Sequence, residues 1–416
     1  MTPDRVPSGW RSAKYGDAMT EADERAGDRL GLPVLSVTKT RGPMLASERF
    51  GKALHSRDLS RYRVAHRDVI VADPMLLWDG SIGTQGVVDA GLVSPDYRVY
   101  APSDQADPAF LAYVVRSPTM LPYYQGGARG TNVRRNRIAR ADFLAIPLAL
   151  PPLSEQRKIA RILACADEAI ETTQSVIDQL GVAKKAMMAE LLTRGLPGRH
   201  TRFKPTEIGE VPEDWDVLTL GAITVESAFG PRFPATEYSP SGNFGTLRTT
   251  DVTAAWEIDY STIPRARLDE TQFRAHVLQD HDLLVTRSGT CGVVCVFKRQ
   301  AIDIIPGAFL IRFRLRPSAQ PEFVRLAMMT PATAARVQAM AAGGVQKNLS
   351  GTNLSRLALP MPPAVEQAEI VQAVEALDTR LRAESAVAEH LRALKTALVS
   401  VLLTGQVRVT PDGEAA

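Results

Sequence analysis

The chain has 416 residues, of which 45% are hydrophobic and 23% charged, a composition typical of a globular protein with two to four structural units. Its 49 basic and 46 acidic residues leave a formal net charge of +3, so the total charge does not indicate a nucleic-acid binder. The longest apolar runs are far shorter than the roughly 20 residues of a membrane helix, no signal-peptide core opens the sequence, and three cysteines make no disulfide framework. We therefore expect a cytoplasmic protein that contacts no membrane.

The first 150 residues are predicted to form a mixed α/β region. Residues 68–72 and 97–100 carry the β-branched and aromatic side chains typical of strands, and 109–116 has a helical pattern. Glycine, proline and serine punctuate these segments, as expected of short elements joined by turns.

Residues 126–140 (GGARGTNVRRNRIAR) form a basic segment without an acidic residue. Guanidinium groups match phosphate oxygens and guanine edges, and Thr131 and Asn132 can also donate hydrogen bonds to phosphate. The segment is a candidate nucleic-acid contact, with a solvated surface as the alternative. Its basic residues are Arg129, Arg134, Arg135, Arg137 and Arg140.

A long helix is predicted after Pro151-Pro152. Apolar residues recur at alternating intervals of four and three from Ile159 to Leu191, which is a heptad pattern. The prolines suit a helix start, and Gly195 suits a helix stop. At 1.5 Å per residue, a helix of about 38 residues spans roughly 57 Å.

A second globular part follows a connection rich in proline and glycine at 194–214. Its strand-like segments are 282–286, 293–297 and 309–315, and its helical pattern covers 321–342. Arg312, Arg314 and Arg316 alternate along the last strand and should share one face, which makes them a second basic cluster or, alternatively, part of a solvated surface.

The second half of the chain repeats the first. PPLSEQ at 151–156 recurs as PPAVEQ at 362–367, and the same offset of 211 relates the two helical regions over more than 40 residues without a gap. Trp10 and Trp215 each stand six residues before a glycine, which extends the repeat upstream. The repeat predicts an α+β protein in which two pseudo-symmetric mixed α/β domains are separated by two long antiparallel coiled-coil helices. The expected segments are domain 1 at 1–151, a central helix at 152–195, domain 2 at 196–361 and a C-terminal helix at 362–416.

Each predicted helix carries polar residues at matching seam positions. If the helices pair antiparallel about a pseudo-twofold axis, the residue numbers of any two facing residues add up to the same value. Lys184 with Glu384 and Thr173 with Lys395 both give 568. We expect these pairs to set the register, because a lysine facing a glutamate fixes orientation. The alternative is that both lysines extend to solvent.

The chain carries no recognisable catalytic constellation. A phosphate-binding loop, a glycine-rich cofactor fingerprint, a methyltransferase motif, a nucleophile elbow and a metal-ligand set are all missing from the sequence. The net charge, divided by region, is +4 for 1–150, 0 for 151–198, +2 for 199–361 and −3 for 362–416. The positive charge therefore belongs to the two globular parts, as expected of two DNA-binding domains on a neutral spacer.

The doubled proline–proline–x–x–glutamate–glutamine signature before a long helix resembles the specificity subunit of type I restriction–modification systems. PLALPPLSEQRKIARIL, LALPMPPAVEQAEIVQAV and EIGEVPEDWDVLTLGAI are close to the family pattern, and DLLVTRSGTCGVV and ADPMLLWDGSIG resemble segments of its recognition domains. The resemblance covers nearly the whole chain.

The resemblance implies a non-catalytic subunit that recognises a split sequence in double-stranded DNA. Each target recognition domain would read one half, the helices would set the gap, and two methyltransferase subunits and, in the full complex, restriction subunits would bind. No cofactor is expected on this chain; S-adenosylmethionine, ATP and Mg are expected on the partners. The DNA-contacting residues are expected to be Trp78, Ser81, Arg129, Thr131, Asn132, Arg134, Arg135 and Arg137 in domain 1, and Arg287, Ser288, Gln346, Lys347 and Asn348 in domain 2.

A different class of protein remains open at this point. The chain could be a non-enzymatic scaffold with two ligand-binding or protein-binding domains on a coiled coil, although such a scaffold has no need for an acid-free segment at 126–140. That the chain is itself a nuclease or methylase is disfavoured by the missing motifs.

Overall fold

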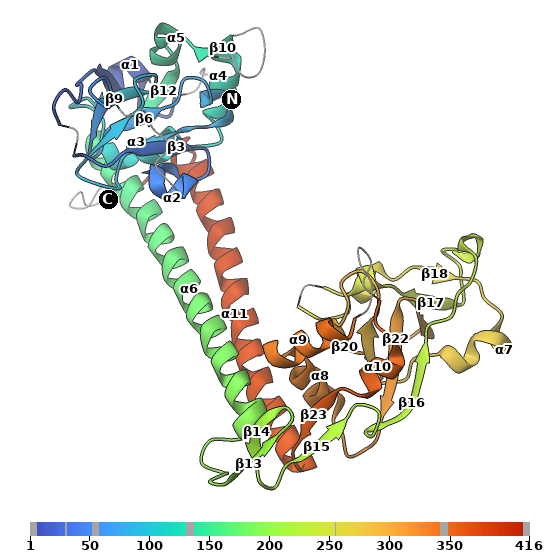
Figure 1. Ribbon diagram of the computed structural model, residues 1–416. Helices are drawn as coiled ribbons and strands as arrows, with labels where there is room; N and C mark the ends of the chain where they lie inside the picture. Colours follow the sequence, from blue (N-terminus) through green and yellow to red (C-terminus); the bar gives the residue numbers. More distant parts are fainter. Residues whose placement is uncertain are drawn as a thin grey trace. The chain divides into compact units, whose positions relative to one another are not determined.

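A computed structural model describes residues 6–410 except 30, 52–57, 130–136, 254 and 342–347 (Figure 1). The chain divides into two compact units: unit 1 is Met1–Ser175 with Ser385–Ala416, and unit 2 is Val176–Glu384. Two long helices, α6 (Leu153–Arg194) and α11 (Ala364–Leu402), each run from one unit into the other. None of the helices in the described part of the chain combines the length and apolar composition needed to cross a membrane.

The globular part of unit 1 is built from short strands and helices. Its elements are β1 (Arg11–Lys14), α1 (Tyr15–Ala18), β2 (Met19–Ala22), β3 (Leu35–Thr38), β4 (Gly42–Leu45), α2 (Ala46–Phe50), β5 (Arg63–His66), β6 (Ile70–Ala72), η1 (Leu77–Asp79), β7 (Ile82–Thr84), β8 (Ala90–Val93), β9 (Arg98–Pro102), α3 (Pro108–Val114), α4 (Leu121–Gly127), β10 (Ala128–Arg129), β11 (Arg137–Ile138), α5 (Arg140–Leu144) and β12 (Pro147–Leu150).

The globular part of unit 2 is similar but larger. Its elements are β13 (Phe203–Thr206), β14 (Gly209–Pro212), β15 (Asp216–Thr219), β16 (Thr224–Phe229), η3 (Ala235–Glu237), β17 (Phe244–Leu247), η4 (Thr249–Asp251), η5 (Tyr260–Thr262), β18 (Arg265–Ala266), α7 (Glu270–Phe273), η6 (Arg274–His276), β19 (Leu283–Thr286), β20 (Val294–Val296), β21 (Ile304–Pro306), β22 (Leu310–Leu315), α8 (Pro321–Met329), α9 (Pro331–Met340), α10 (Gly351–Ser355) and β23 (Ala358–Met361).

The sequence repeat is also a repeat of topology. The described residues of unit 1 form a four-stranded antiparallel sheet in the order β2-β9-β6-β7, and those of unit 2 form one in the order β16-β22-β19-β20. Equivalent strands occupy equivalent places, since Ile70 pairs with Tyr100 in the first sheet and Leu283 with Phe313 in the second. The predicted strands at 68–72, 97–100, 282–286, 293–297 and 309–315 all coincide with members of these sheets.

A separate antiparallel strand pair joins the two ends of each globular part. β1 pairs with β12 in unit 1, and β15 pairs with β23 in unit 2. Each pair links the strand directly after the repeated tryptophan, Trp10 or Trp215, to the strand directly before the two prolines. The globular part therefore begins and ends beside the start of a long helix.

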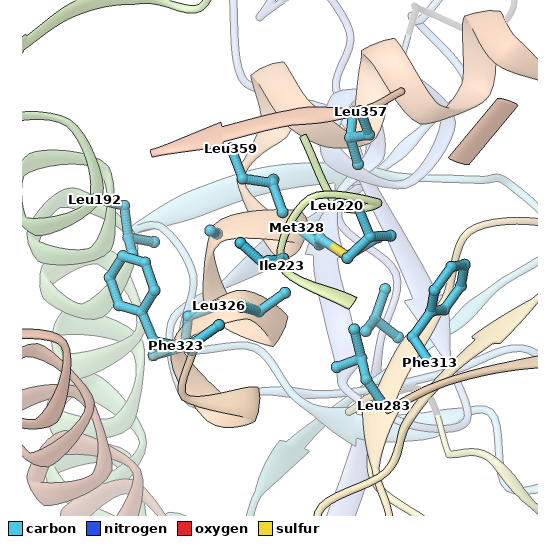
Figure 2. Packing of buried hydrophobic residues seen from close by; sticks show 14 of the residues in the cluster. Leu192, Leu220, Ile223, Leu283, Phe313, Phe323, Leu326, Met328, Leu357 and Leu359 are labelled. Carbon is cyan, nitrogen blue, oxygen red and sulfur yellow. The ribbon is translucent and has the colours of Figure 1, made fainter. Parts of the chain in front are cut away.

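Each unit has its own main hydrophobic core. In unit 2, Leu192 of α6, Phe323 of α8 and Phe313 of β22 belong to one core and are almost fully buried; Leu192 lies beside Phe323, whereas Phe313 lies at the other side of the cluster (Figure 2). In unit 1, Ile159 and Leu163 of α6 join the corresponding core around Tyr100. A fully buried leucine or phenylalanine contributes about 1.5–3 kcal/mol, so both cores attach the globular part firmly to the helices.

One predicted helix is two. The helical pattern at 321–342 is divided between α8 and α9, because Pro331 cannot continue a helix through its missing N–H. Thr330 instead caps α9, and its hydroxyl accepts a hydrogen bond from the backbone of Thr333 at 3.3 Å.

The proline–proline–x–x–glutamate–glutamine motif has a structural explanation that is the same in both units. Glu155 accepts the indole N–H of Trp10 at 3.0 Å, and Glu366 accepts that of Trp215 at 3.0 Å. Both carboxylates and both indoles are buried. The sequence repeat singled out these residues without assigning them a role.

The glutamine of each motif fastens the long helix to the globular part. The side chain of Gln156 accepts the backbone N–H of Asp107 at 2.8 Å and donates to the carbonyls of Gln105 and Pro151. Gln367 makes the matching bonds with Gln320, Ser318 and Pro362. Asp107 and Gln320 directly precede α3 and α8, so each glutamine aligns the start of a long helix with the start of a short one.

A basic side chain from the segment that follows the other long helix completes each cluster. Arg408, which follows α11, binds both oxygens of Glu155 at 2.8 Å. His200, which follows α6, lies with Nε2 2.8 Å from Glu366 and Nδ1 3.1 Å from Asp214. We call these clusters the helix-end clamps: Trp10–Glu155–Arg408 in unit 1 and Trp215–Glu366–His200 in unit 2.

A glycine follows the end of each long helix: Gly195, the stop expected from the sequence, directly follows α6, and Gly405 stands three residues after the end of α11. Gly195 and Gly405 have φ of +77° and +67°, the left-handed conformation that favours glycine after a helix. A Cβ at Gly195 would lie 2.6 Å from His200, and one at Gly405 would lie 2.4 Å from Pro7. Both glycines therefore allow the chain to turn directly into a helix-end clamp.

The polar pairs predicted to set the helix register are wrong. Lys184 binds Asp378 in unit 2, and Lys395 binds Asp167 in unit 1. Glu384 instead pairs with Arg380 on its own helix at 2.6 Å, and Thr173 donates to the carbonyl of Ala169.

The residue numbers of the two observed pairs also add up to a single value, which is 562 in place of the expected 568. The long lysine side chains reach beyond the seam to acids that stand one residue after the seam positions Ala166 and Leu377. In each unit, therefore, the stretches of α6 and α11 lie side by side and antiparallel, in matching registers (Figure 1).

Candidate nucleic-acid interface

Those predicted DNA-contacting residues that the structure describes lie in equivalent elements of the two units. The loop between the last two strands of each four-stranded sheet, β6–β7 or β19–β20, contacts the segment that follows α4 or α9. Trp78 and Ser81 belong to the first loop, and Arg287 and Ser288 to the second. The sequence predicted these segments separately, and the fold brings each loop together with its partner segment.

In unit 1 the loop is held in shape by hydrogen bonds between its own residues. Asp73 is buried, its carboxylate accepts the backbone N–H of Met75 at 3.0 Å, and burial raises the pKa of this carboxyl. Trp78 is half-buried and donates its indole N–H to the carbonyl of Met75 at 2.9 Å. Ser81 is buried, so it shapes the loop from inside and does not face solvent as a DNA-contacting side chain would.

Arg137 lies beside this loop. It is exposed, and one guanidinium nitrogen lies 3.5 Å from Sδ of Met75. Its backbone in β11 pairs with that of Arg129 in β10. Thr131, Asn132, Arg134 and Arg135 lie outside the described residues.

In unit 2 the guanidinium of Arg287 is held in place by two neighbours. It stacks on the ring of Phe229 at 4.4 Å from the centroid, and its Nε donates to the side-chain oxygen of Asn348 at 3.2 Å. Ser288 and Asn348 form an isolated backbone bridge between two segments 60 residues apart. Gln346 and Lys347 lie outside the described residues.

Backbone geometry holds the Arg287 loop in a tight turn. Gly289 and Gly292 have φ of +74° and +85°. A Cβ at Gly292 would lie 2.6 Å from Val337 of α9, so a side chain there would push the loop away from the helix. The amide of Gln338 also donates to the carbonyl of Cys291 at 2.7 Å. The loop therefore holds Arg287 in place, and four of the five N–H donors of its guanidinium are not used by Asn348.

Two of the three arginines of the second predicted basic cluster are neutralised, and the third, Arg316, donates to the carbonyl of Ala222 at 3.0 Å. Arg312 and Arg314 share one face of β22 as expected, but both bind Glu226, and Arg314 also binds Asp282 at 3.0 Å. Arg312 is buried. These guanidinium groups stabilise the sheet and are not available to phosphate.

Sequence analysis missed the exposed aromatic side chains of this region. Phe229, Tyr238 and Phe309 are 43%, 42% and 54% exposed, and Phe229 supports the guanidinium of Arg287. Sequence offers no signal for them, because a single phenylalanine in a strand-like segment is usually a core residue.

The sequence predicts no metal site, but one cluster of side chains contains atoms of the kind that bind metal ions. His200, Asp214 and Glu366 bring three possible ligand atoms within 4.8 Å of one another, the one such group among the described residues. The two carboxylates face opposite nitrogens of the imidazole, so one ion cannot take the place of both hydrogen bonds. The cluster is an ion-pair network that belongs to the helix-end clamp of unit 2.

These features define a duplicated protein whose two α/β domains each present a braced loop beside a basic segment. The sequence model of the type I restriction modification DNA specificity domain matches residues 53–181 and 212–391. The chain belongs to this family. It is a specificity subunit, the non-catalytic DNA-recognising component of a type I restriction–modification complex.

Similar proteins align over most of the chain. The specificity subunit of the type I restriction enzyme MjaVIII of Methanocaldococcus jannaschii is 26% identical, over 97% of this chain and 94% of its own length. A putative MjaX specificity subunit from the same organism is 23% identical, over 92% and 88%. The EcoKI specificity subunit of Escherichia coli is 27% identical over 69% of this chain and 60% of its own.

Solved structures share the fold. The HsdS subunit from Thermoanaerobacter tengcongensis aligns over 98% of this chain and 99% of its own, with a TM-score of 0.52 and 17% identity. The S subunit of a type I system from M. genitalium covers 96% and 98%, with a TM-score of 0.53 and 14% identity.

Proposed function

We propose that each unit reads one half of a bipartite target in double-stranded DNA. The observation that carries this proposal is the repeated arrangement of a strand-to-strand loop against the segment after a short helix. In unit 1 it joins Arg137 to the Met75–Trp78 loop, and in unit 2 it joins Asn348 to Arg287. An arginine held by neighbouring side chains presents its remaining donors in a fixed direction, which is the requirement for reading the hydrogen-bonding edge of a base.

The long helices would set the gap between the half-sites and recruit two methyltransferase subunits. Support comes from apolar side chains that remain exposed on them: Val182 at 69%, Val387 at 46% and Leu394 at 52%. Val387 and Leu394 are seven residues apart on α11 and therefore lie on one face of that helix, as expected of residues that contact a partner protein. S-adenosylmethionine, and ATP with Mg for the restriction subunits, would be bound by these partners.

The test is to map methylated adenines in DNA from cells that express this chain with its methyltransferase subunits. A two-part motif with a fixed gap is expected. Two matched variants then assign the halves: Arg137→Glu is expected to weaken discrimination in one half-site, and Arg287→Glu in the other, because each removes a base or phosphate contact of one unit. A good base contact discriminates by about 1–3 kcal/mol, so the altered half should lose roughly ten- to a hundredfold specificity.

Arg299→Glu is the control for the change of charge, since Arg299 lines a different groove of unit 2 beside Glu226 and Arg314. A single continuous motif would contradict the proposal. So would variants at Arg137 and Arg287 that degrade the same half-site.

A further inference from the structure

A groove lies beside Arg287 in unit 2 and none of the residues predicted from the sequence lines it. Its volume is about 540 Å³, and its walls come from the residues after β16, the β17–η4 turn and the turn before β22. The side chains that matter here are Arg232, Phe233, Tyr238, Thr246, Arg248 and Phe309. The lining contains no acidic residue.

The groove is continuous with the Arg287 loop. The backbone N–H of Arg287 donates to the carbonyl of Phe309 at 2.9 Å, so a wall residue of the groove is bonded directly to the loop. On the other side, Phe229 supports the Arg287 guanidinium and is followed by Gly230, which bonds Leu310 at 3.1 Å. A ligand that reaches Arg287 therefore meets the mouth of this groove next.

Aromatic surface is exposed along this line. Phe229, Tyr238 and Phe309 each expose more than two fifths of their surface, although aromatic side chains normally seek burial. The ring of Tyr238 is positioned by Phe233, 5.3 Å away. Phe309 makes no ring contact with another described aromatic residue, so its ring is available to a ligand.

The polar groups of the groove also lack partners or face solvent. Arg232 is exposed and forms no ion pair or hydrogen bond with the described residues, in contrast to Arg312 and Arg314 of the same unit. The hydroxyl of Thr246 is buried without a hydrogen-bond partner in the described part of the chain. A buried polar group with no partner is uncommon and is typical of a place where a ligand or water completes the bond.

Aromatic faces, a free guanidinium and an unpaired hydroxyl together match a nucleotide. Bases and sugars pack on aromatic rings, whereas phosphate oxygens accept from arginine. The acid-free lining with its free guanidinium favours an anionic strand over a neutral protein segment, because a neutral segment would leave Arg232 unpaired.

We propose that this groove is a second DNA-contact site of unit 2, in which Phe309 and Tyr238 contact the bases or sugars of a strand that continues from the Arg287 loop, and Arg232 binds its phosphate. The inference rests on the proposed function, since it extends the surface with which unit 2 reads its half-site. Arg248 also lines the groove, but its guanidinium is bound to Asp251 at 2.7 Å, so Arg232 and not Arg248 is assigned to the phosphate.

The test uses the full chain assembled with its methyltransferase subunits and a duplex that carries the motif mapped for the unaltered protein. Phe309→Ala is expected to weaken binding of this duplex about tenfold, since the loss of one base contact in a specific duplex site costs about 1–3 kcal/mol. Arg232→Gln is expected to lower the slope of log affinity against log salt by about one, the effect of one lost phosphate contact. Methylation mapping of Phe309→Ala should show relaxed specificity in the unit 2 half-site alone.

Two matched controls lie elsewhere in unit 2. Val225→Ala removes an apolar side chain that is 63% exposed on β16, and Arg299→Gln removes one positive charge outside the groove. Both should bind as the unaltered protein does. Thermal unfolding of all four variants shows whether any is misfolded, which is not expected because the changed side chains are largely exposed.

Variants at Phe309 and Arg232 that keep the original affinity, salt slope and motif would overturn the groove assignment while the two-part motif still supports the proposed function. An unaltered assembly that binds no mapped duplex would instead remove the proposed function, and the groove would lose its ligand with it.

Discussion

The two helix-end clamps use the same tryptophan and glutamate but different cations. In unit 1, Arg408 binds Glu155 through two parallel hydrogen bonds and keeps its charge at every accessible pH. In unit 2, His200 bridges Glu366 and Asp214, so this clamp needs a protonated imidazole to make both bonds at once. The buried carboxylate is thus the same in both repeats, whereas the basic side chain that faces it differs.

Removal of the carboxylate is expected to have the largest effect. Glu366→Ala leaves the indole N–H of Trp215 and the imidazole of His200 without their buried acceptor, and Glu155→Ala does the same to Trp10 and Arg408. The loss of one partner from a buried ion pair costs about 3–5 kcal/mol. Hydrogen–deuterium exchange of peptides from each unit measures this cost, and each variant should destabilise its own unit much more than the other.

The effect in unit 1 should be the smaller of the two, because the side chain of Arg408 is 42% exposed and that of His200 only 5%. Equal losses in both units would show that the indole bond dominates and that the choice of cation is irrelevant.

A fall in pH should destabilise the unit 1 clamp, and Arg408 should set the pH at which this loss occurs. Burial opposes ionisation of Glu155, but the hydrogen bonds from Arg408 and Trp10 outweigh it, and the pKa of the carboxyl falls below its usual 4.5. A carboxyl whose pKa is lower in the folded than in the unfolded chain stabilises the fold above the unfolded value. This stabilisation is lost as the pH falls through the folded value.

Arg408→Gln should therefore move the acid loss of unit 1 to higher pH and reduce its stability at neutral pH by about 1 kcal/mol, the magnitude for a partly exposed pair. Urea unfolding between pH 3 and pH 7, followed by exchange of peptides near Trp10, gives the profile. Unit 2 in the same samples is the internal control. An unchanged acid profile would mean that Arg408 does not set the pKa of Glu155.

The ion pairs between the long helices should be alike in the two units, and their effect is the smallest. Lys184–Asp378 and Lys395–Asp167 are related by the repeat, and their side chains are between 23% and 35% exposed. Double-mutant cycles should give a coupling of about 0.5 kcal/mol for each pair, and none for Lys184 with Glu384. A larger coupling in unit 1 would show that Tyr113, which donates to Asp167 at 2.8 Å, strengthens that pair.

The repeat and the long helices could be predicted from the sequence because both depend on local pattern. The register of the helices could not be predicted in this way. The heptad pattern identifies only the seam positions, whereas Lys184 binds Asp378, which stands one residue outside the seam. The equivalence of Asp167 with Asp378 was nevertheless visible in the offset of 211. Pairing every charged residue that the repeat conserves, rather than those of the seam alone, would have found the observed contact.

The interface could be predicted in part. Arg287 and Asn348 were each expected to contact DNA, but only the fold shows that they touch one another across 61 residues. Phe309 and Phe313 illustrate the limit of the pattern: both lie in one strand-like segment, yet β22 begins at Leu310, so Phe313 is buried in the sheet and Phe309 is exposed on the turn before it.

The contacts at the helix ends have a consequence for chain connectivity. In unit 2 the polypeptide runs without interruption from Gly195 through His200 to Trp215, whereas in unit 1 the corresponding residues around Gly405 and Trp10 touch through space, with Arg408 bound to the carbonyl of Ser8. Each unit therefore holds the segment after one long helix against the start of its globular part, through the chain itself in unit 2 and through space in unit 1. A circular permutant that links residues 410 and 6 and opens the β13–β14 hairpin would keep every clamp contact while exchanging the order of the two domains.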